Sequence, residues 1–135
     1  SVQNAPIHNH IQQWMDQDAW VIVALAPHDN EKVQGLLTHV ARVQSALGKE
    51  ERRVKMVYLK SPHSPNLVLG PNWFQAEVDT PEARQYFSMY LDAPDEGGVF
   101  LVDPLGYMVL GYAADEDPHF IYKDLKRLLR LSKVG

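Results

Sequence analysis

The stretch that decides the fold runs from Trp20 to Gly48 and reads WVIVALAPHDNEKVQGLLTHVARVQSALG. Its first part is an unbroken apolar run rich in β-branched residues, which is typical of a strand buried on both faces. Pro27 ends this strand, and apolar residues then recur at helical spacing. They are Val33, Leu36, Leu37, Val40, Val43 and Leu47. The stretch therefore predicts a strand, a tight turn and a helix, with Asn30 as N-cap and Gly48 just past the helix end.

The composition indicates one globular domain without thiol chemistry. The chain has 135 residues, of which 45% are apolar and 22% are charged, so it can bury one hydrophobic core. Its net charge of −4 gives no general reason to bind nucleic acid or an anionic membrane. The sequence contains no cysteine, which excludes disulfides, thiol redox catalysis and thiolate metal sites. We predict an N-terminal lead-in at residues 1–19 and one domain at residues 20–135.

A second strand is predicted at residues 54–59, which makes a strand–helix–strand unit with parallel strands. Residues 61–79 mix prolines and glycine with apolar side chains and are predicted to be irregular. A helix should begin near Thr80. Strands at residues 99–102 and 107–112, joined by a turn at residues 103–106, should form a hairpin, and a last helix should follow Asp117 as its N-cap.

Two stretches are candidate interaction surfaces. The irregular segment carries apolar side chains of the kind that dominate partner recognition, although covering a sheet edge is the simpler explanation. These side chains are Leu67, Leu69, Trp73 and Phe74. The last helix carries cations, among them Lys126, Arg127 and Arg130. Such cations suit the dipole at a helix C-terminus, and they could also bind an acidic partner or lipid phosphates.

The turn after the first strand holds the side chains that are the best candidates for catalysis or metal binding. His28 and Lys32 lie four positions apart at a helix N-terminus, so both could face one point there. One hypothesis is a small enzyme that uses this pair for acid–base work. Another is a metal-binding module in which His28 acts with His63, and His8 or His10 could contribute. Neither a nucleophile motif nor a phosphate loop accompanies them in the sequence.

A family resemblance appears at residues 100–110, FLVDPLGYMVL, and residues 123–129, KDLKRLL. Together with the order of the predicted elements, these motifs resemble the Sco/SenC family of thioredoxin-fold proteins. Members of that family are membrane-anchored and help to deliver copper to cytochrome c oxidase. The resemblance covers most of the chain from Trp20 onward. It implies an α/β, thioredoxin-like fold, in which a central mixed β-sheet (a parallel βαβ unit plus a C-terminal β-hairpin) is flanked by helices.

The family's site consists of a Cys-x-x-x-Cys pair after the first strand and a histidine before the strand that leads into Asp-Pro-x-Gly. The positions that match these ligands are His28, Lys32 and Gly98. Two thiolates and an imidazole hold copper, whereas an ammonium group repels a metal ion. The resemblance therefore implies a member that has lost the copper and redox site and has no cofactor.

What the resemblance implies about function is a non-catalytic, extracytoplasmic domain on the periplasmic side of the inner membrane. It would act as an interaction or assembly factor in cytochrome c oxidase biogenesis. Its partners would be the oxidase or its assembly factors, and it would meet the membrane through an anchor absent from this chain. The histidine-based metal module and the small enzyme of unknown reaction are the alternatives.

Overall fold

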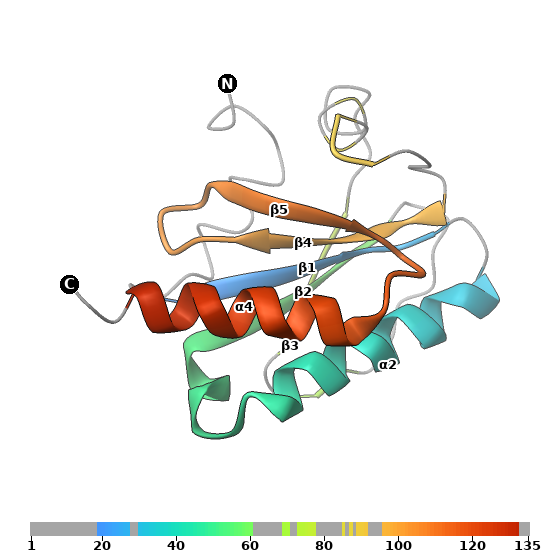
Figure 1. Ribbon diagram of the computed structural model, residues 1–135. Coiled ribbons are helices and arrows are strands. Elements are labelled where there is room, and N and C mark those ends of the chain that lie inside the picture. Colours follow the sequence, from blue (N-terminus) through green and yellow to red (C-terminus); the bar gives the residue numbers. More distant parts are fainter. Residues whose placement is uncertain are drawn as a thin grey trace.

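The computed structural model describes residues 19–27, 30–60, 69–70, 73–77, 85, 87, 89–91 and 96–132. Within these residues the chain forms a β-sheet and two long helices, shown in Figure 1. In chain order the elements are β1 (Trp20–Leu25), α2 (Asn30–Ala46), the 3₁₀-helix η2 (Gly48–Arg53), β2 (Val54–Lys60), β3 (Trp73–Glu77), β4 (Gly98–Val102), β5 (Met108–Ala113) and α4 (Pro118–Ser132).

The sheet is mixed, with the strand order β3-β2-β1-β4-β5. β1 pairs in parallel with β2, in the register that places Trp20 opposite Val54, and β2 pairs in parallel with β3. β4 runs antiparallel to both β1 and β5, so β4 and β5 form the C-terminal hairpin. This topology confirms the predicted parallel βαβ unit and the predicted hairpin, and with them the thioredoxin-like α/β fold.

The central strand β1 is buried on both of its faces, as its apolar run predicted. Trp20, Ile22 and Ala24 pack in the cluster formed with α2 and α4, which cover one face of the sheet (Figure 1). Val21 and Val23 pack on the opposite face with Phe87 and other buried residues. Burial on both faces explains why the strand contains no polar residue.

Helix α2 turns the predicted apolar stripe toward the sheet. All six residues of the stripe are buried, namely Val33, Leu36, Leu37, Val40, Val43 and Leu47. Gly48 follows the helix with φ of 62°, a left-handed conformation that glycine adopts without steric cost. The helix begins at Asn30, whose side chain lies outside the described part, so its role as N-cap stays a prediction.

The hairpin turn and the start of α4 form as predicted. Asp103 Oδ1 accepts hydrogen bonds from the backbone N–H groups of Leu105 (3.0 Å) and Tyr107 (2.9 Å), which close the turn. Asp117 Oδ1 accepts a hydrogen bond of 2.9 Å from the N–H of His119, and α4 begins at Pro118. Asp117 therefore caps the helix, with proline at the first helical position.

The prediction that residues 61–79 are irregular is wrong for residues 73–77, which form strand β3 at the edge of the sheet. Trp73 and Phe74 therefore lie on a strand and not on a loop. Both are half-buried: Trp73 packs against the cluster under the helices, and Phe74 packs against the cluster on the other face. Lys55 lies over the Phe74 ring, 5.4 Å from its centroid. Successive side chains of a β-strand point to opposite faces of the sheet, which is why Trp73 and Phe74 pack against different clusters.

Candidate functional site

One end of the sheet carries Lys32 and Gly98, two of the three positions that were predicted to match the family's ligands. Lys32 lies in the first turns of α2, and Glu96 lies two residues before Gly98, which begins β4 and pairs with Leu25 at the end of β1. Lys32 Nζ is 2.7 Å from Glu96 Oε2, and these side chains are 56% and 59% exposed. The ion pair joins residues 64 positions apart in sequence. Because both partners are exposed, the pair contributes about 0–1 kcal/mol to stability. It matters here because it lies at the sheet end where the family's ligands were predicted.

The backbone beside this ion pair leaves no room for a side chain at residue 98. A Cβ atom at Gly98 would lie 2.8 Å from the carbonyl oxygen of Tyr112 and 2.8 Å from Leu91 Cδ1. At Gly97, with φ of 80°, a Cβ atom would lie 2.5 Å from the carbonyl oxygen of Leu25. A histidine at position 98 would therefore need the hairpin to move. The position predicted to match the family's histidine is sterically closed in this chain.

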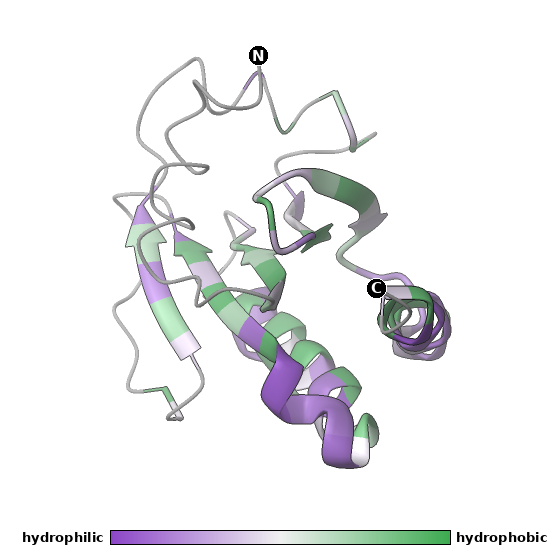
Figure 2. Cartoon of the chain, turned by 90° about the vertical axis from the view of Figure 1, so that its left-hand side faces the viewer, coloured by the Kyte–Doolittle hydropathy of each residue, from purple (hydrophilic) through white to green (hydrophobic). Residues whose placement is uncertain are grey.

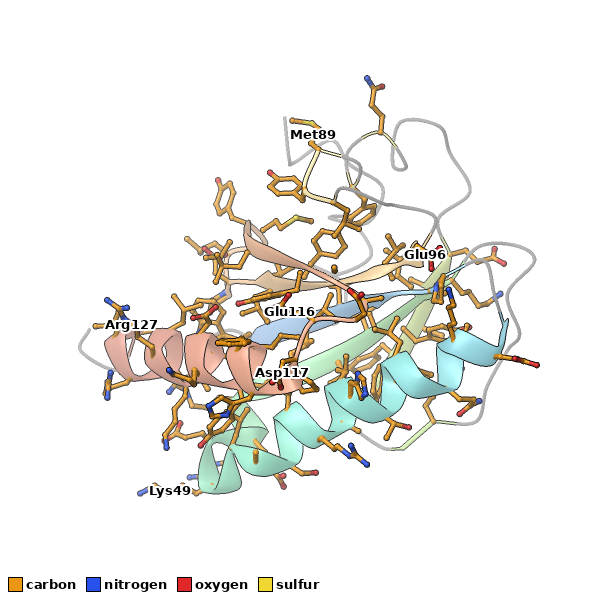
Figure 3. All side chains as sticks on the ribbon, turned by 45° about the vertical axis from the view of Figure 1, so that its right-hand side comes forward. Lys49, Met89, Glu96, Glu116, Asp117 and Arg127 are labelled. Carbon is orange, nitrogen blue, oxygen red and sulfur yellow. The ribbon has the colours of Figure 1, made fainter. Side chains whose placement is uncertain are left out.

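The ion pair stands at a groove of about 730 Å³ between α2 and the connection from β5 to α4. Leu36 and Leu91 contribute apolar walls. The charged lining groups comprise three carboxylates and one ammonium group. The full lining is Lys32, Gly35, Leu36, His39, Tyr90, Leu91, Glu96, Gly97, Gly111, Tyr112, Ala113, Ala114, Asp115 and Glu116. Figure 3 shows the labelled side chains of Glu96 and Glu116 on the upper side of α2. The groove offers an apolar surface with an acidic border.

His39 is a groove residue that the sequence analysis did not single out. It is half-buried, and its Nδ1 atom is buried without a hydrogen-bond partner among the described residues. Lys32, Gly35 and His39 follow one another at i, i+3 and i+7, so they share one stripe of α2. This spacing is visible in the sequence and could have identified the stripe beside the apolar one.

Tyr112 supplies a fixed hydroxyl on the other side of the groove. Its hydroxyl donates a 2.7 Å hydrogen bond to Asp124 Oδ2 on α4. Burial raises the pKa of Tyr112 far above its usual value, and the hydrogen bond and charge of Asp124 raise it further. Both effects favour the protonated hydroxyl, which donates this hydrogen bond and ties β5 to α4.

The remaining predicted site residues are placed as follows. His28, His63 and Leu67 lie outside the described residues, and Leu69 is partly buried against the cluster under the helices. Lys126, Arg127 and Arg130 are exposed on α4, and Lys126 Nζ lies 3.1 Å from the hydroxyl of Tyr122. Within the described ranges no three histidine, aspartate or glutamate side chains come together as a metal site. The histidine-based metal module thus stays a prediction.

A family model described as "Transmembrane-like, thioredoxin-like, C-terminal domain" matches residues 20–132 of the chain. No curated protein sequence matches significantly. Of the helices that the structure describes, none combines the length and apolar character needed to cross a bilayer.

Solved structures of Sco proteins share the fold. Apo Sco1 of Thermus thermophilus is 20% identical, with a TM-score of 0.62 over 87% of this chain and 83% of that one. ScoI of Arabidopsis thaliana, solved with copper bound, is 13% identical, with a TM-score of 0.60 over 85% of this chain and 86% of that one. BsSco, described as a member of the Sco family of cytochrome c oxidase assembly proteins, is 16% identical, with a TM-score of 0.58 over 85% and 82%. These likenesses confirm a Sco-like thioredoxin fold.

Proposed function

Because the chain belongs to the family of transmembrane-like, thioredoxin-like C-terminal domains, we propose that it is a non-catalytic interaction domain. It acts outside the cytoplasmic membrane in the assembly of cytochrome c oxidase, and it does so through protein contacts. The contact surface is the groove end, which comprises the Lys32–Glu96 ion pair and the groove beside it.

The observation that carries the proposal is the Lys32–Glu96 ion pair, because Lys32 is one of the residues that we match to the metal ligands of the Sco family. An ammonium group held at 2.7 Å by a carboxylate repels a metal ion and offers no electron pair to it. The closed backbone at Gly98 supports the same conclusion, because a histidine ligand does not fit there. A chain without cysteine also has no thiol with which to exchange disulfides.

The shape and charge of the groove end support a protein partner. Pockets with apolar walls and a few charged groups at the border bind amphipathic segments, because the walls supply affinity and the charges fix the orientation. The structural neighbours indicate the process in which such a partner would take part. Arabidopsis ScoI holds copper, and BsSco belongs to a family of cytochrome c oxidase assembly proteins. The family description and these neighbours also support the extracytoplasmic location.

Capture from solubilised membranes of the source organism tests the proposal. The immobilised domain should retain subunits of cytochrome c oxidase or its assembly factors, identified by mass spectrometry. Lys32→Glu should reduce this capture, because it places two carboxylates side by side at the contact surface. Lys49→Glu is the matched control, since Lys49 is an exposed cation on η2 and makes no part of the groove.

Equal capture by the domain with Lys32→Glu and by the unchanged domain would contradict the proposed surface. Metal titration tests the other half of the proposal. A stoichiometric copper(I) complex that survives a soft competing chelator would show that the metal function is retained. Loss of that complex in His28→Ala would assign it to the histidine-based module.

A further inference from the structure

The end of the molecule opposite the groove carries cations beside protruding apolar side chains. We call this surface the basic end and define it by Lys49, Arg52, Leu105, Arg127, Arg130 and Leu131. All six residues are exposed, with Leu105 at 72% and Leu131 at 60%. Aliphatic side chains exposed to this extent stand among the most solvated apolar residues that the structure describes.

Backbone pairing and side-chain contacts place these residues at one end of the sheet. Arg53 binds the carbonyl oxygen of Leu129 at 3.0 Å, so η2 lies against the last turns of α4. Val54 pairs with Trp20, where the chain enters β1, and Val102 pairs with Val21 just before the hairpin turn that carries Leu105. Figure 2 looks onto this end, with α4 seen nearly along its axis and η2 as a hydrophilic coil in front.

One acid near the basic end is paired with a cation outside the set, and the others are outnumbered. Glu50 pairs with Arg53 at 3.0 Å. Asp103 accepts two backbone hydrogen bonds within its own turn, and Asp124 accepts the hydroxyl of Tyr112. Glu51 is exposed and faces solvent on η2. Hydrogen bonds from neutral donors leave the charges of Asp103 and Asp124 in place. The four cations of the basic end therefore outnumber the three carboxylates of Glu51, Asp103 and Asp124 by one.

We propose that the basic end rests on an anionic membrane surface, where its cations contact lipid phosphates and Leu105 and Leu131 enter the headgroup layer. Clustered lysine and arginine are attracted to anionic lipid headgroups, and aliphatic side chains beside them add affinity by leaving water. Leu105 and Leu131 stand on convex features, the tip of a hairpin and the last turn of a helix. Protruding side chains suit a deformable lipid interface better than a protein surface, which needs complementary area.

This arrangement gives the molecule an orientation. Trp20, where the described chain enters the sheet, lies at the basic end, and the Lys32–Glu96 ion pair lies at the other. Figure 3 shows Lys49 and Arg127 at one side of the molecule and Glu96 at the other. A domain that rests on its basic end presents the groove end away from the bilayer.

The absence of cysteine makes a labelling test unambiguous, because one introduced thiol is the only thiol. The domain is tethered by an added N-terminal hexahistidine tag to vesicles that contain a nickel-chelating lipid. Leu105→Cys, Leu131→Cys and Glu96→Cys each carry an environment-sensitive fluorophore. With phosphatidylglycerol in the vesicles, emission should shift to the blue at positions 105 and 131 and stay unchanged at position 96. Unshifted emission at 105 and 131, or an equal shift at 96, overturns the proposal.

Charge variants supply a second measurement on untethered protein. Binding to phosphatidylglycerol vesicles should weaken about fivefold for each cation removed, so Arg127→Gln with Arg130→Gln should lose about 30-fold. Lys32→Gln, which removes a cation from the groove end, should bind as the unchanged domain does. Pure phosphatidylcholine vesicles should bind neither. Equal losses in the double variant and in Lys32→Gln, or an unchanged affinity in the double variant, would overturn the proposal.

Discussion

Replacement by alanine should have opposite effects on stability at Gly98 and at Gly35. Gly98→Ala brings a methyl group to 2.8 Å from the carbonyl oxygen of Tyr112, so the hairpin or β1 must shift. Overpacking of this kind typically costs about 1–3 kcal/mol. A Cβ atom at Gly35, inside α2, meets nothing within 4 Å. Gly35→Ala should therefore stabilise the protein by about 0.5–1 kcal/mol, because alanine loses less backbone entropy in a helix.

Chemical unfolding of the two variants measures both effects against one reference. If Gly98→Ala unfolds at the same denaturant concentration as the unchanged chain, position 98 has room for a side chain. A histidine ligand would then fit there, contrary to the prediction.

Tyr112 should make the free energy of unfolding depend on alkaline pH. Its pKa is raised in the folded protein, so above about pH 10 the unfolded tyrosine ionises while the folded one keeps its proton. The stabilisation is therefore complete below that pH and is lost as the pH rises. Tyr112→Phe should show a shallower loss of stability between neutral pH and about pH 11. Parallel curves for the two proteins would show that Tyr112 does not cause the dependence.

Arg53 closes the C-terminal end of α4, which is an effect at the scale of elements. Its guanidinium group donates to the carbonyl oxygen of Leu129 at 3.0 Å and to Ser132 Oγ at 2.8 Å, and it pairs with Glu50 at 3.0 Å. Arg53→Ala should cost about 1.5–3 kcal/mol, because hydrogen bonds from a charged donor are lost together. The neighbouring Arg52 is exposed, so Arg52→Ala should change stability by less than about 0.5 kcal/mol. Equal unfolding midpoints for both variants would show that the contacts of Arg53 add nothing to the stability of the protein.

The connection between β1 and α2 can be tested by restoring two thiols. In His28→Cys with Lys32→Cys, the two sulfur atoms should come within bridging distance, because residues four apart at a helix start face one another. Mild oxidation should form a disulfide in protein that stays folded, and Lys32→Cys alone should keep a free thiol. Mass spectrometry and near-ultraviolet circular dichroism report the two properties. Two free thiols in folded, oxidant-treated double variant would show a different geometry at the turn.

The sequence predicted those elements whose signal lies in neighbouring residues, such as a helical repeat, an apolar run or a capping residue. The stripe of α2, the double burial of β1 and the cap at Asp117 are of this kind. Strand β3 was missed because it has only five residues, without a clear alternation of apolar and polar side chains, and because Gly70 and Pro71 lie shortly before it. An edge strand also needs little apolar character. The Lys32–Glu96 pair was missed because tertiary structure alone brings together residues 64 positions apart. The groove likewise draws its lining from several distant segments.

At the scale of the whole molecule, the groove end and the basic end should act independently. Helix α2 begins beside the ion pair and leads to η2 at the basic end, and its 17 residues span about 25 Å at a rise of 1.5 Å per residue. This distance is about three Debye lengths at physiological ionic strength, so charges at one end are screened from the other. Sites that share no partner are also additive in their effects.

Independence is measured by applying each assay to the variants of the other end. Arg127→Gln with Arg130→Gln should leave capture of membrane proteins by the detergent-solubilised domain unchanged, and Lys32→Glu should leave binding to phosphatidylglycerol vesicles unchanged. When all three substitutions are combined, each assay should show only the loss caused by its own end. If the arginine variants also lose protein capture in detergent, where no bilayer is present, the two ends would belong to one extended protein interface. The separation into a membrane-facing end and a partner-facing end would then be wrong.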